Sequence, residues 1–143
     1  MDWKKSIIAS NSRILAKDPR VRTTELGQCF KYEKGKIESS EIVVGGKYQV
    51  TLPFNKFYAA MHTHREDEYS NDYFSAGDIK VIIDSECRIF ILGYMGELLY
   101  IDTNKLPQHA KNLIKEYPKA ILKRKKYIRD VLVRIINSHA RIL

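Results

Sequence analysis

Residues 57–78 read FYAAMHTHREDEYSNDYFSAGD, and no other segment of the chain concentrates so many potentially reactive side chains. The apolar run before the histidines predicts a strand over residues 56–64. Side chains two positions apart on a strand point to the same face, so His62 and His64 are expected to lie together. Imidazole is a preferred ligand of zinc, and a catalytic zinc usually takes three ligands from the protein. The pair therefore predicts two-thirds of a metal site.

The second half of the stretch supplies a candidate third ligand. Ser75 precedes a helix predicted over residues 76–85, and Asp78 stands in the first turn of that helix. A carboxylate beside the two imidazoles would complete a three-ligand site. The same Ser-x-x-Asp spacing fits a capping box, in which the acid holds the start of the helix. The two interpretations are compatible, and the sequence leaves both open.

The segments on either side predict an α+β fold, in which helices flank a mixed β-sheet. Runs of β-branched and aromatic residues between glycine and proline turn signals predict the strands. A polar, acidic segment over residues 65–73 predicts a loop. The predicted helices cover residues 3–17, 76–85, 107–117 and 119–139; the strands cover 21–32, 41–44, 48–52, 56–64, 88–94 and 98–102, with turns at 33–36, 45–46 and 95–97.

The C-terminal part of the chain differs in charge from the rest. Residues 105–143 hold eleven Lys and Arg against Glu116 and Asp130, whereas residues 1–104 are close to neutral and the whole chain carries +8. We therefore predict a metal-binding domain over residues 1–104 and a basic helical extension over residues 105–143. Such an extension predicts an acidic partner: nucleic acid, an anionic membrane surface or an acidic protein. The alternative is a solvated helix face without a partner.

Two of the predicted helices carry apolar residues at helical spacing, which indicates one buried face on each. The stripe on the last helix is expected to pack either on the domain or on a second subunit. In the second case the protein would be a homo-oligomer. The stripes are Trp3, Ile7, Ile8, Ile14 and Leu15 on the first helix, and Ile121, Ile128, Val131, Leu132, Ile135 and Ile136 on the last.

Composition excludes several classes of protein. The chain has 143 residues, of which 44% are hydrophobic and 29% charged, so general disorder is excluded. No apolar run approaches the roughly 18 residues that span a bilayer, and the N-terminus lacks the apolar length of a signal peptide. These features predict a soluble, cytoplasmic protein. Cys29 and Cys87 do not form a CxxC pair, so we expect them to be reduced and buried.

The order His-x-His, then Ser-x-x-Asp, resembles the signature of the JAMM/MPN metalloprotease family, which also has a glutamate upstream. The resemblance implies a zinc ion (Zn2+) held by His62, His64 and Asp78, and an oxyanion stabilised by Ser75. It implies hydrolysis of a peptide or isopeptide bond in a protein or peptide substrate, including a ubiquitin-like one. It also implies a JAB/MPN-like fold with a cytidine-deaminase-like layout.

The glutamate that the resemblance requires is assigned to Glu25. It follows the first predicted helix, within Thr24-Glu25-Leu26-Gly27, as the family's glutamate does. It would take a proton from the zinc-bound water and deliver it to the leaving amine. Glu33, Glu38 and Glu41 are the competing candidates.

Within this family the pattern is most similar to JAB-like domains at the ends of bacterial polymorphic (Rhs-type) toxins. That similarity implies a toxin or effector domain, delivered as part of a secreted protein. Two features depart from the family: Arg65 stands in place of the usual proline, and the thirteen residues between His64 and Asp78 include an acidic insert. The matching motifs are Glu25-Leu26-Gly27, Gly46-Lys47-Tyr48, His62-Thr63-His64, Phe74-Ser75-Ala76-Gly77-Asp78 and Gly96-Glu97-Leu98-Leu99-Tyr100.

A second class of function stays open. The basic extension would make the chain a nucleic-acid- or protein-binding module, in which the metal site is structural or degenerate. No helix-turn-helix or RNA-binding motif is visible in the sequence. The complete set of Glu25, His62, His64, Ser75 and Asp78 argues against degeneracy.

Overall fold

The computed structural model describes residues 1–45, 52–66 and 73–143 of the chain. The α-helices in these ranges are α1 (Ile7–Ala16), α2 (Ala76–Ser85), α3 (Gln108–Glu116) and α4 (Leu122–His139). The strands are β1 (Leu26–Glu33), β2 (Lys36–Ser39), β3 (Val43–Val44), β4 (Ala59–Thr63), β5 (Ile89–Tyr94), β6 (Glu97–Asp102) and β7 (Arg141–Ile142). Short 3-10 helices are η1 (Trp3–Lys5), η2 (Pro19–Arg22), η3 (Thr103–Lys105) and η4 (Tyr117–Lys119).

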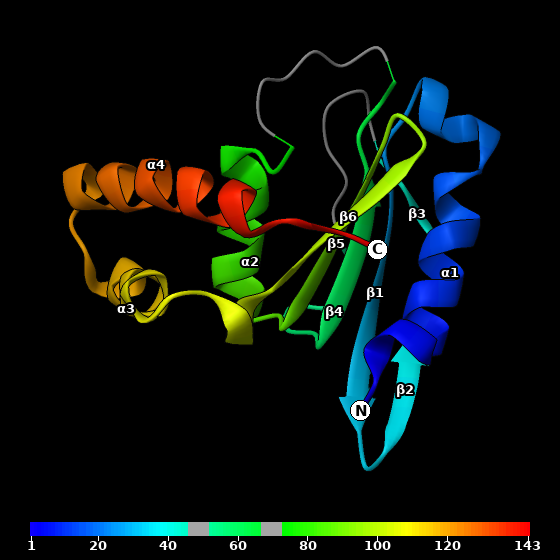
Figure 1. Ribbon diagram of the computed structural model, residues 1–143, viewed down its shortest axis with the longest axis horizontal. Coiled ribbons are helices and arrows are strands. Elements are labelled where there is room, and N and C mark those ends of the chain that lie inside the picture. Colours follow the sequence, from blue (N-terminus) through cyan, green and yellow to red (C-terminus); the bar gives the residue numbers. More distant parts are fainter. Residues whose placement is uncertain (46–51, 67–72) are drawn as a thin grey trace.

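The described strands form one mixed sheet between two layers of helix. Its order is β2-β1-β4-β5-β6-β7, and β3 also pairs with β1. Helix α1 covers one face of the sheet, whereas α2, α3 and α4 lie on the other side (Figure 1). The predicted α+β fold with a mixed sheet and flanking helices is confirmed. The more specific JAB/MPN-like, cytidine-deaminase-like layout stays a prediction.

Strand β4, which carries the histidines, lies in the middle of the sheet. It is antiparallel to β1, with Gly27 opposite His62, and parallel to β5, with His62 opposite Leu92. A parallel pair needs a crossover connection, and helix α2 provides it between β4 and β5. All five residues of β4 are buried, because helices cover the sheet on both faces.

Two hairpins confirm the predicted turns. The loop between β1 and β2 is Lys34-Gly35 and that between β5 and β6 is Met95-Gly96, and all four residues have positive φ. A two-residue hairpin loop with positive φ at both positions matches the right-handed twist of the strands it joins. Glycine at the second position of each loop adopts this conformation without steric cost.

A separate hydrophobic core lies on each face of the sheet. On the α1 face, Trp3, Ile8 and Leu15 pack with sheet residues that include Phe30 and Met61. On the other face, side chains of α2, α3 and α4 pack over the sheet around Phe90. Cys29 and Cys87 are free thiols and both are buried, as predicted.

The N-terminal predictions need two corrections. The predicted helix over 3–17 is divided at Ser6, whose Oγ accepts the N–H of Ile8 (3.1 Å) and starts a new helix. In α1, Ile7 and Ile14 are exposed, so part of the predicted stripe faces solvent. The predicted strand over 21–32 starts late, because the Asp18 carboxylate accepts the N–H of Arg20 (2.9 Å) and holds residues 19–22 in a 3-10 turn.

The edge of the sheet beside β1 also differs from the prediction. Strand β2 was not predicted, because its Lys-Ile-Glu-Ser sequence is polar and short of β-branched residues. The strand predicted over 41–44 is reduced to Val43–Val44. The strand predicted over 48–52, except Leu52, lies outside the described residues, as do Gly46-Lys47-Tyr48 and the acidic residues Asp67, Glu68 and Asp72 of the predicted loop.

The C-terminal extension packs on the rest of the chain. Ile128, Leu132 and Ile136 of α4 are fully buried in the core that also contains α2, and β7, which was not predicted, pairs with β6. Ile121 departs from the predicted stripe: it precedes the helix and is exposed. The division into domains at residue 104 and a homo-oligomer stay predictions. None of the described helices is long and apolar enough to cross a lipid bilayer.

Candidate metal centre

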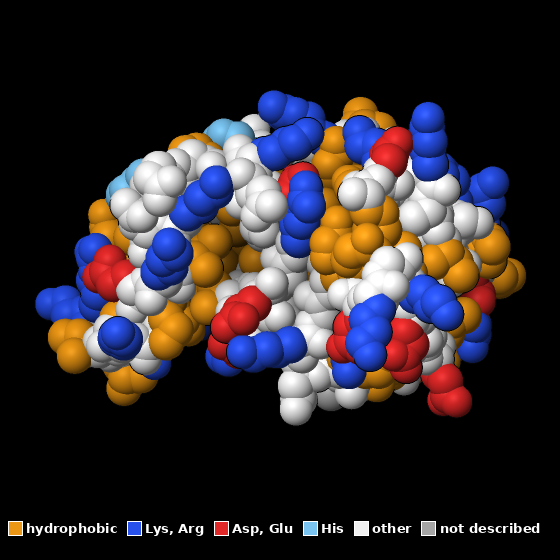
Figure 2. Space-filling model, turned by 90° about the horizontal axis from the view of Figure 1, so that it is seen from below, with side chains coloured by type: hydrophobic (Ala, Val, Ile, Leu, Met, Phe, Trp, Pro, Cys, Tyr) orange, Lys and Arg blue, Asp and Glu red, His pale blue; other side chains and the backbone are white. Residues whose placement is uncertain are grey.

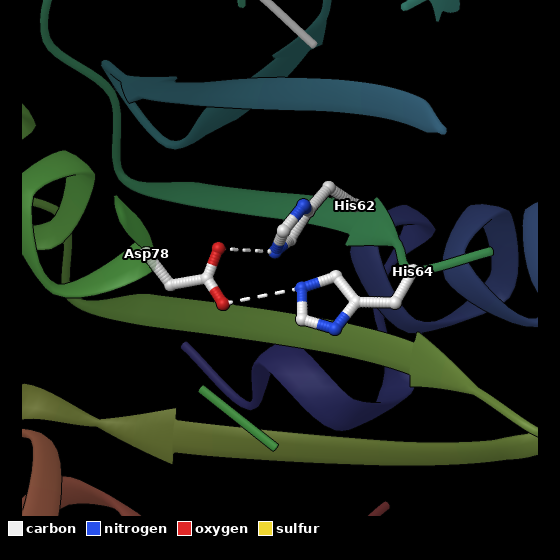
Figure 3. A group of neighbouring side chains, drawn as sticks. All are labelled: His62, His64 and Asp78. Atoms are coloured by element: carbon white, nitrogen blue, oxygen red, sulfur yellow. Dashed lines mark ion pairs between the residues drawn. The ribbon is translucent and has the colours of Figure 1, made fainter. Parts of the chain in front are cut away.

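The three predicted metal ligands come together between β4 and α2. His62 lies within β4, and His64 follows the end of the strand, where its N–H donates to the Gly93 carbonyl (2.9 Å). Asp78 lies in the first turn of α2 and points back toward both imidazoles (Figure 3). All three side chains are buried. Because side chains alternate between the two faces along β4, His62 and His64 point to the same side. The start of α2 brings Asp78 to that side, so the three side chains lie together as the sequence predicted.

The distances between the ligand atoms suit a single ion. His62 Nε2 lies 2.9 Å from Asp78 Oδ1, and His64 Nε2 lies 3.3 Å from Asp78 Oδ2. One ligand atom of each residue lies within 4.8 Å of the others. Ligands held about 2.1 Å from a zinc ion in tetrahedral geometry are about 3.4 Å apart. The group could hold a metal ion, and its two nitrogens and one carboxylate fit zinc.

The electrostatics of the group favour a charged carboxylate. Burial raises the pKa of Asp78, but the charges and hydrogen bonds of His62 and then His64 outweigh it and hold that pKa well below its usual range. A divalent cation bound between the buried carboxylate and the two imidazoles would take the place of the protons that now join them. Its charge would stabilise the buried anion further.

Asp78 also completes the capping box of α2. Its Oδ2 accepts the N–H of Ser75 (2.8 Å), while Ser75 Oγ accepts the N–H of Asp78 (3.2 Å). The carboxylate thus holds the start of the helix and faces the histidines at the same time. The two interpretations that the sequence left open apply together.

Aromatic side chains hold the two imidazole rings in place. The His62 ring packs against Phe90, with centroids 5.3 Å apart, and the His64 ring meets Tyr94 edge-on at 6.0 Å. Phe74 is fully buried and packs against Phe90. Rings fixed by packing lose little further freedom when they bind a ligand, which favours a preformed site.

Comparison with family models, with curated proteins and with solved structures found no match to this chain. The resemblance to the JAMM/MPN family therefore rests on the order and spacing of residues in the sequence alone, and membership of that family stays a prediction.

Glu25 lies next to this site in the register of the sheet. It directly precedes β1, and extension of the β1–β4 pairing by two positions from Gly27 and His62 places it opposite His64. Paired residues of neighbouring strands share a face, so Glu25 faces the same side of the sheet as the histidines. Its side chain is 5% exposed. The competing glutamates, Glu33, Glu38 and Glu41, are all exposed.

Two residues near the site were not recognised as important from the sequence. Arg65, noted there as a departure from the family, is buried directly after His64. Asn137, which lies on α4, forms hydrogen bonds to the backbone of Phe74, one residue before the capping box. No local signal could have identified Asn137, because its partner lies 63 residues away in the sequence.

Proposed function

We propose that this protein is a zinc-dependent hydrolase that cleaves a peptide or isopeptide bond. The observation that carries this proposal is the buried group of His62, His64 and Asp78, whose ligand atoms lie within 4.8 Å of one another. Three protein ligands leave one position of a tetrahedral zinc ion free, as in catalytic rather than structural zinc sites. When bound there, zinc would lower the pKa of a water molecule to about 7 and polarise the substrate carbonyl.

Glu25 is the proposed base and proton carrier. Its carboxylate would accept a proton from the attacking water and pass it to the nitrogen of the leaving amine. Two observations support this choice over the other glutamates: its position opposite His64 in the sheet register and its burial.

Ser75 is the proposed donor to the oxyanion. Its Oγ accepts the Asp78 N–H, and this bond uses a lone pair of the oxygen while leaving the hydroxyl proton available. The serine lies beside the carboxylate of Asp78, at the start of α2. A hydrogen bond to the developing negative charge would stabilise the transition state more than the ground state.

The proposed substrate is a protein or peptide, and a ubiquitin-like protein is the form that the family resemblance favours. By the same resemblance the chain would act as a toxin or effector domain, in the cytoplasm of the producing cell or delivered within a secreted protein. The alternative function is a binding module with a structural metal, supported by the basic residues around α4.

One experiment separates these functions. The purified full chain is analysed for zinc by mass spectrometry and then incubated with lysine-linked di-ubiquitin and with a fluorogenic peptide library. Near-stoichiometric zinc together with cleavage that a chelator abolishes is the expected result. Bound zinc without cleavage of either substrate would support a structural metal, and a chain that binds no zinc on titration would contradict both functions of the site.

A further inference from the structure

The connection between α3 and α4 forms a projecting end of the molecule, remote from the sheet (Figure 1). We refer to residues 118–127, which include Ile121 and Leu122, as the basic tip. Leu122 is 85% exposed and Ile121 is 73% exposed, more than any other large hydrophobic residue in the described part of the chain. Two adjacent aliphatic side chains in this position cost free energy in water unless a partner covers them.

Positive charge surrounds these two side chains. The basic tip holds five Lys and Arg and no acidic residue: Lys119, Lys123, Arg124, Lys125 and Lys126. The nearest acid along the chain, Glu116, is already bound by Arg124, whose Nε lies 2.7 Å from Oε1 and whose Nη2 lies 3.2 Å from Oε2. Figure 2 shows the same combination at this end of the molecule, where hydrophobic side chains lie among blue Lys and Arg.

The basic tip is anchored at both ends. Tyr117 is buried just before it, and Lys125 Nζ lies 5.3 Å above the centre of the Tyr117 ring. Ile128 is fully buried just after it. Because these two anchors fix the backbone on either side, Ile121 and Leu122 are presented outward together rather than as part of a loose terminus.

We propose that the basic tip binds the surface of a bilayer that contains anionic lipids. Ile121 and Leu122 would enter the boundary between headgroups and acyl chains, while the surrounding Lys and Arg would bind the phosphates and carboxylates of the lipids. Stable attachment to a membrane surface needs two such signals, an apolar one and a basic one, and this tip carries both side by side. The proposal does not depend on the metal centre or on the proposed hydrolase activity.

The charge and shape of the tip argue against its other partners. A second copy of the chain would bring two clusters of five basic residues together, which charge repulsion opposes. Single-stranded nucleic acid is bound by basic grooves with several aromatic side chains on which bases stack. The tip has one exposed aromatic ring, Tyr127, and the Arg124 guanidinium lies 4.9 Å from its centre, whereas the two most exposed hydrophobic residues, Ile121 and Leu122, are aliphatic. An anionic lipid surface can bind both parts of the tip at once, because its headgroups attract the Lys and Arg side chains and its acyl chains accommodate Ile121 and Leu122.

The test uses the full chain and two kinds of vesicle, one of phosphatidylcholine alone and one of phosphatidylcholine with phosphatidylserine. Co-sedimentation is expected with the anionic vesicles, and it should weaken as salt concentration rises. The double variants Ile121→Ser/Leu122→Ser and Lys123→Glu/Lys126→Glu should each weaken binding by about ten-fold or more. The altered side chains are exposed, so the fold should be unaffected, and circular dichroism checks this.

Matched controls come from the opposite end of the molecule. Ile14→Ser removes an aliphatic side chain that is also exposed, on α1, and Lys36→Glu reverses an exposed charge on β2. Both should bind anionic vesicles as the unaltered chain does. Loss of binding in the control variants would overturn the proposal, as would the absence of vesicle binding. Binding to an RNA or DNA oligonucleotide that Lys123→Glu/Lys126→Glu abolishes and Ile121→Ser/Leu122→Ser leaves intact would also overturn it, in favour of a nucleic-acid surface.

Discussion

The side-chain amide of Asn137, on α4, forms hydrogen bonds to both the backbone N–H and the backbone carbonyl of Phe74. Its Oδ1 accepts the Phe74 N–H at 2.8 Å, and its Nδ2 donates to the Phe74 carbonyl at 2.9 Å. Phe74 directly precedes Ser75, which starts α2 and sets the position of Asp78. Helix α4 therefore holds the start of α2, the helix that carries Asp78 of the candidate metal centre.

Replacement of Asn137 tests this link. Asn137→Ala should lower the free energy of unfolding by about 2 kcal/mol, because it leaves a partly buried N–H and carbonyl of Phe74 without their partner. It should also weaken zinc binding, since the position of Asp78 would no longer be fixed from α4. Urea denaturation and zinc titration measure the two effects. Ser138→Ala, which removes an exposed hydroxyl bonded to the Ile135 carbonyl, is the neighbouring control and should change neither quantity.

The two roles of Ser75 can be separated by a matched pair of caps. Ser75→Ala and Ser6→Ala each remove the N-cap side chain of a helix, so each should cost about 1 kcal/mol of stability. Only Ser75→Ala should also lower kcat, by about 100-fold, because only that hydroxyl would face the oxyanion. Equal activity of the two variants in the ubiquitin assay would show that Ser75 is a cap alone.

Glu25→Gln should keep the metal and lose activity. The amide preserves size and burial but cannot carry a proton, so kcat should fall by about 100-fold or more at unchanged zinc content. The exposed Glu33, at the other end of β1, offers the control Glu33→Gln, which should leave kcat unchanged. Full hydrolysis by Glu25→Gln would assign the base elsewhere.

Removal of the metal should lower thermal stability. An ion that binds the folded chain at about 100 times its Kd adds about 2.7 kcal/mol, which corresponds to a Tm difference of about 10 °C between the zinc-loaded and chelated protein. His62→Ala should show no such difference, because it removes one of the three ligands. Differential scanning calorimetry with and without chelator measures this. A zinc-dependent Tm that survives in His62→Ala would place the ion at another site.

Alkaline pH should destabilise the fold through Cys87. Burial raises the pKa of the Cys87 thiol from 9.0 to about 12. The unfolded thiol ionises above pH 9 and the folded one does not, so the stabilising contribution is complete below pH 9 and is lost as pH rises toward 12. The free energy of unfolding should therefore fall by about 1.4 kcal/mol for each pH unit in that range.

Urea denaturation between about pH 8 and about pH 10 measures this slope, with Cys87→Ala as the comparison. The variant should show a smaller loss of stability over that range, whatever its stability at neutral pH. Equal slopes for the two proteins would mean that Cys87 does not contribute. Alkylation by iodoacetamide gives an independent readout, because the buried neutral thiol should react only after unfolding.

The sequence alone predicted those features that depend on local spacing. The alternation of a strand puts His62 and His64 on one face. The Ser-x-x-Asp spacing predicts a capping box, in which Ser75 and Asp78 each accept the backbone N–H of the other. The hairpin at Met95-Gly96 and the bounds of α2 follow from equally local signals, because turn conformation and helix capping depend on neighbouring residues. These are the elements that the structure reproduces.

Features that depend on distant contacts required the tertiary structure. The sequence offered Glu25 with three competing glutamates, and only the tertiary structure showed that Glu25 is buried and lies opposite His64 in the register of β1 and β4. The exposure of Ile7, Ile14 and Ile121 depends on where each helix meets the sheet or its neighbours, which helical periodicity does not specify. The bond from Asn137 to Phe74 joins residues far apart in the sequence. Local sequence thus determined which side chains share a face, whereas packing between elements decided which of those faces are buried.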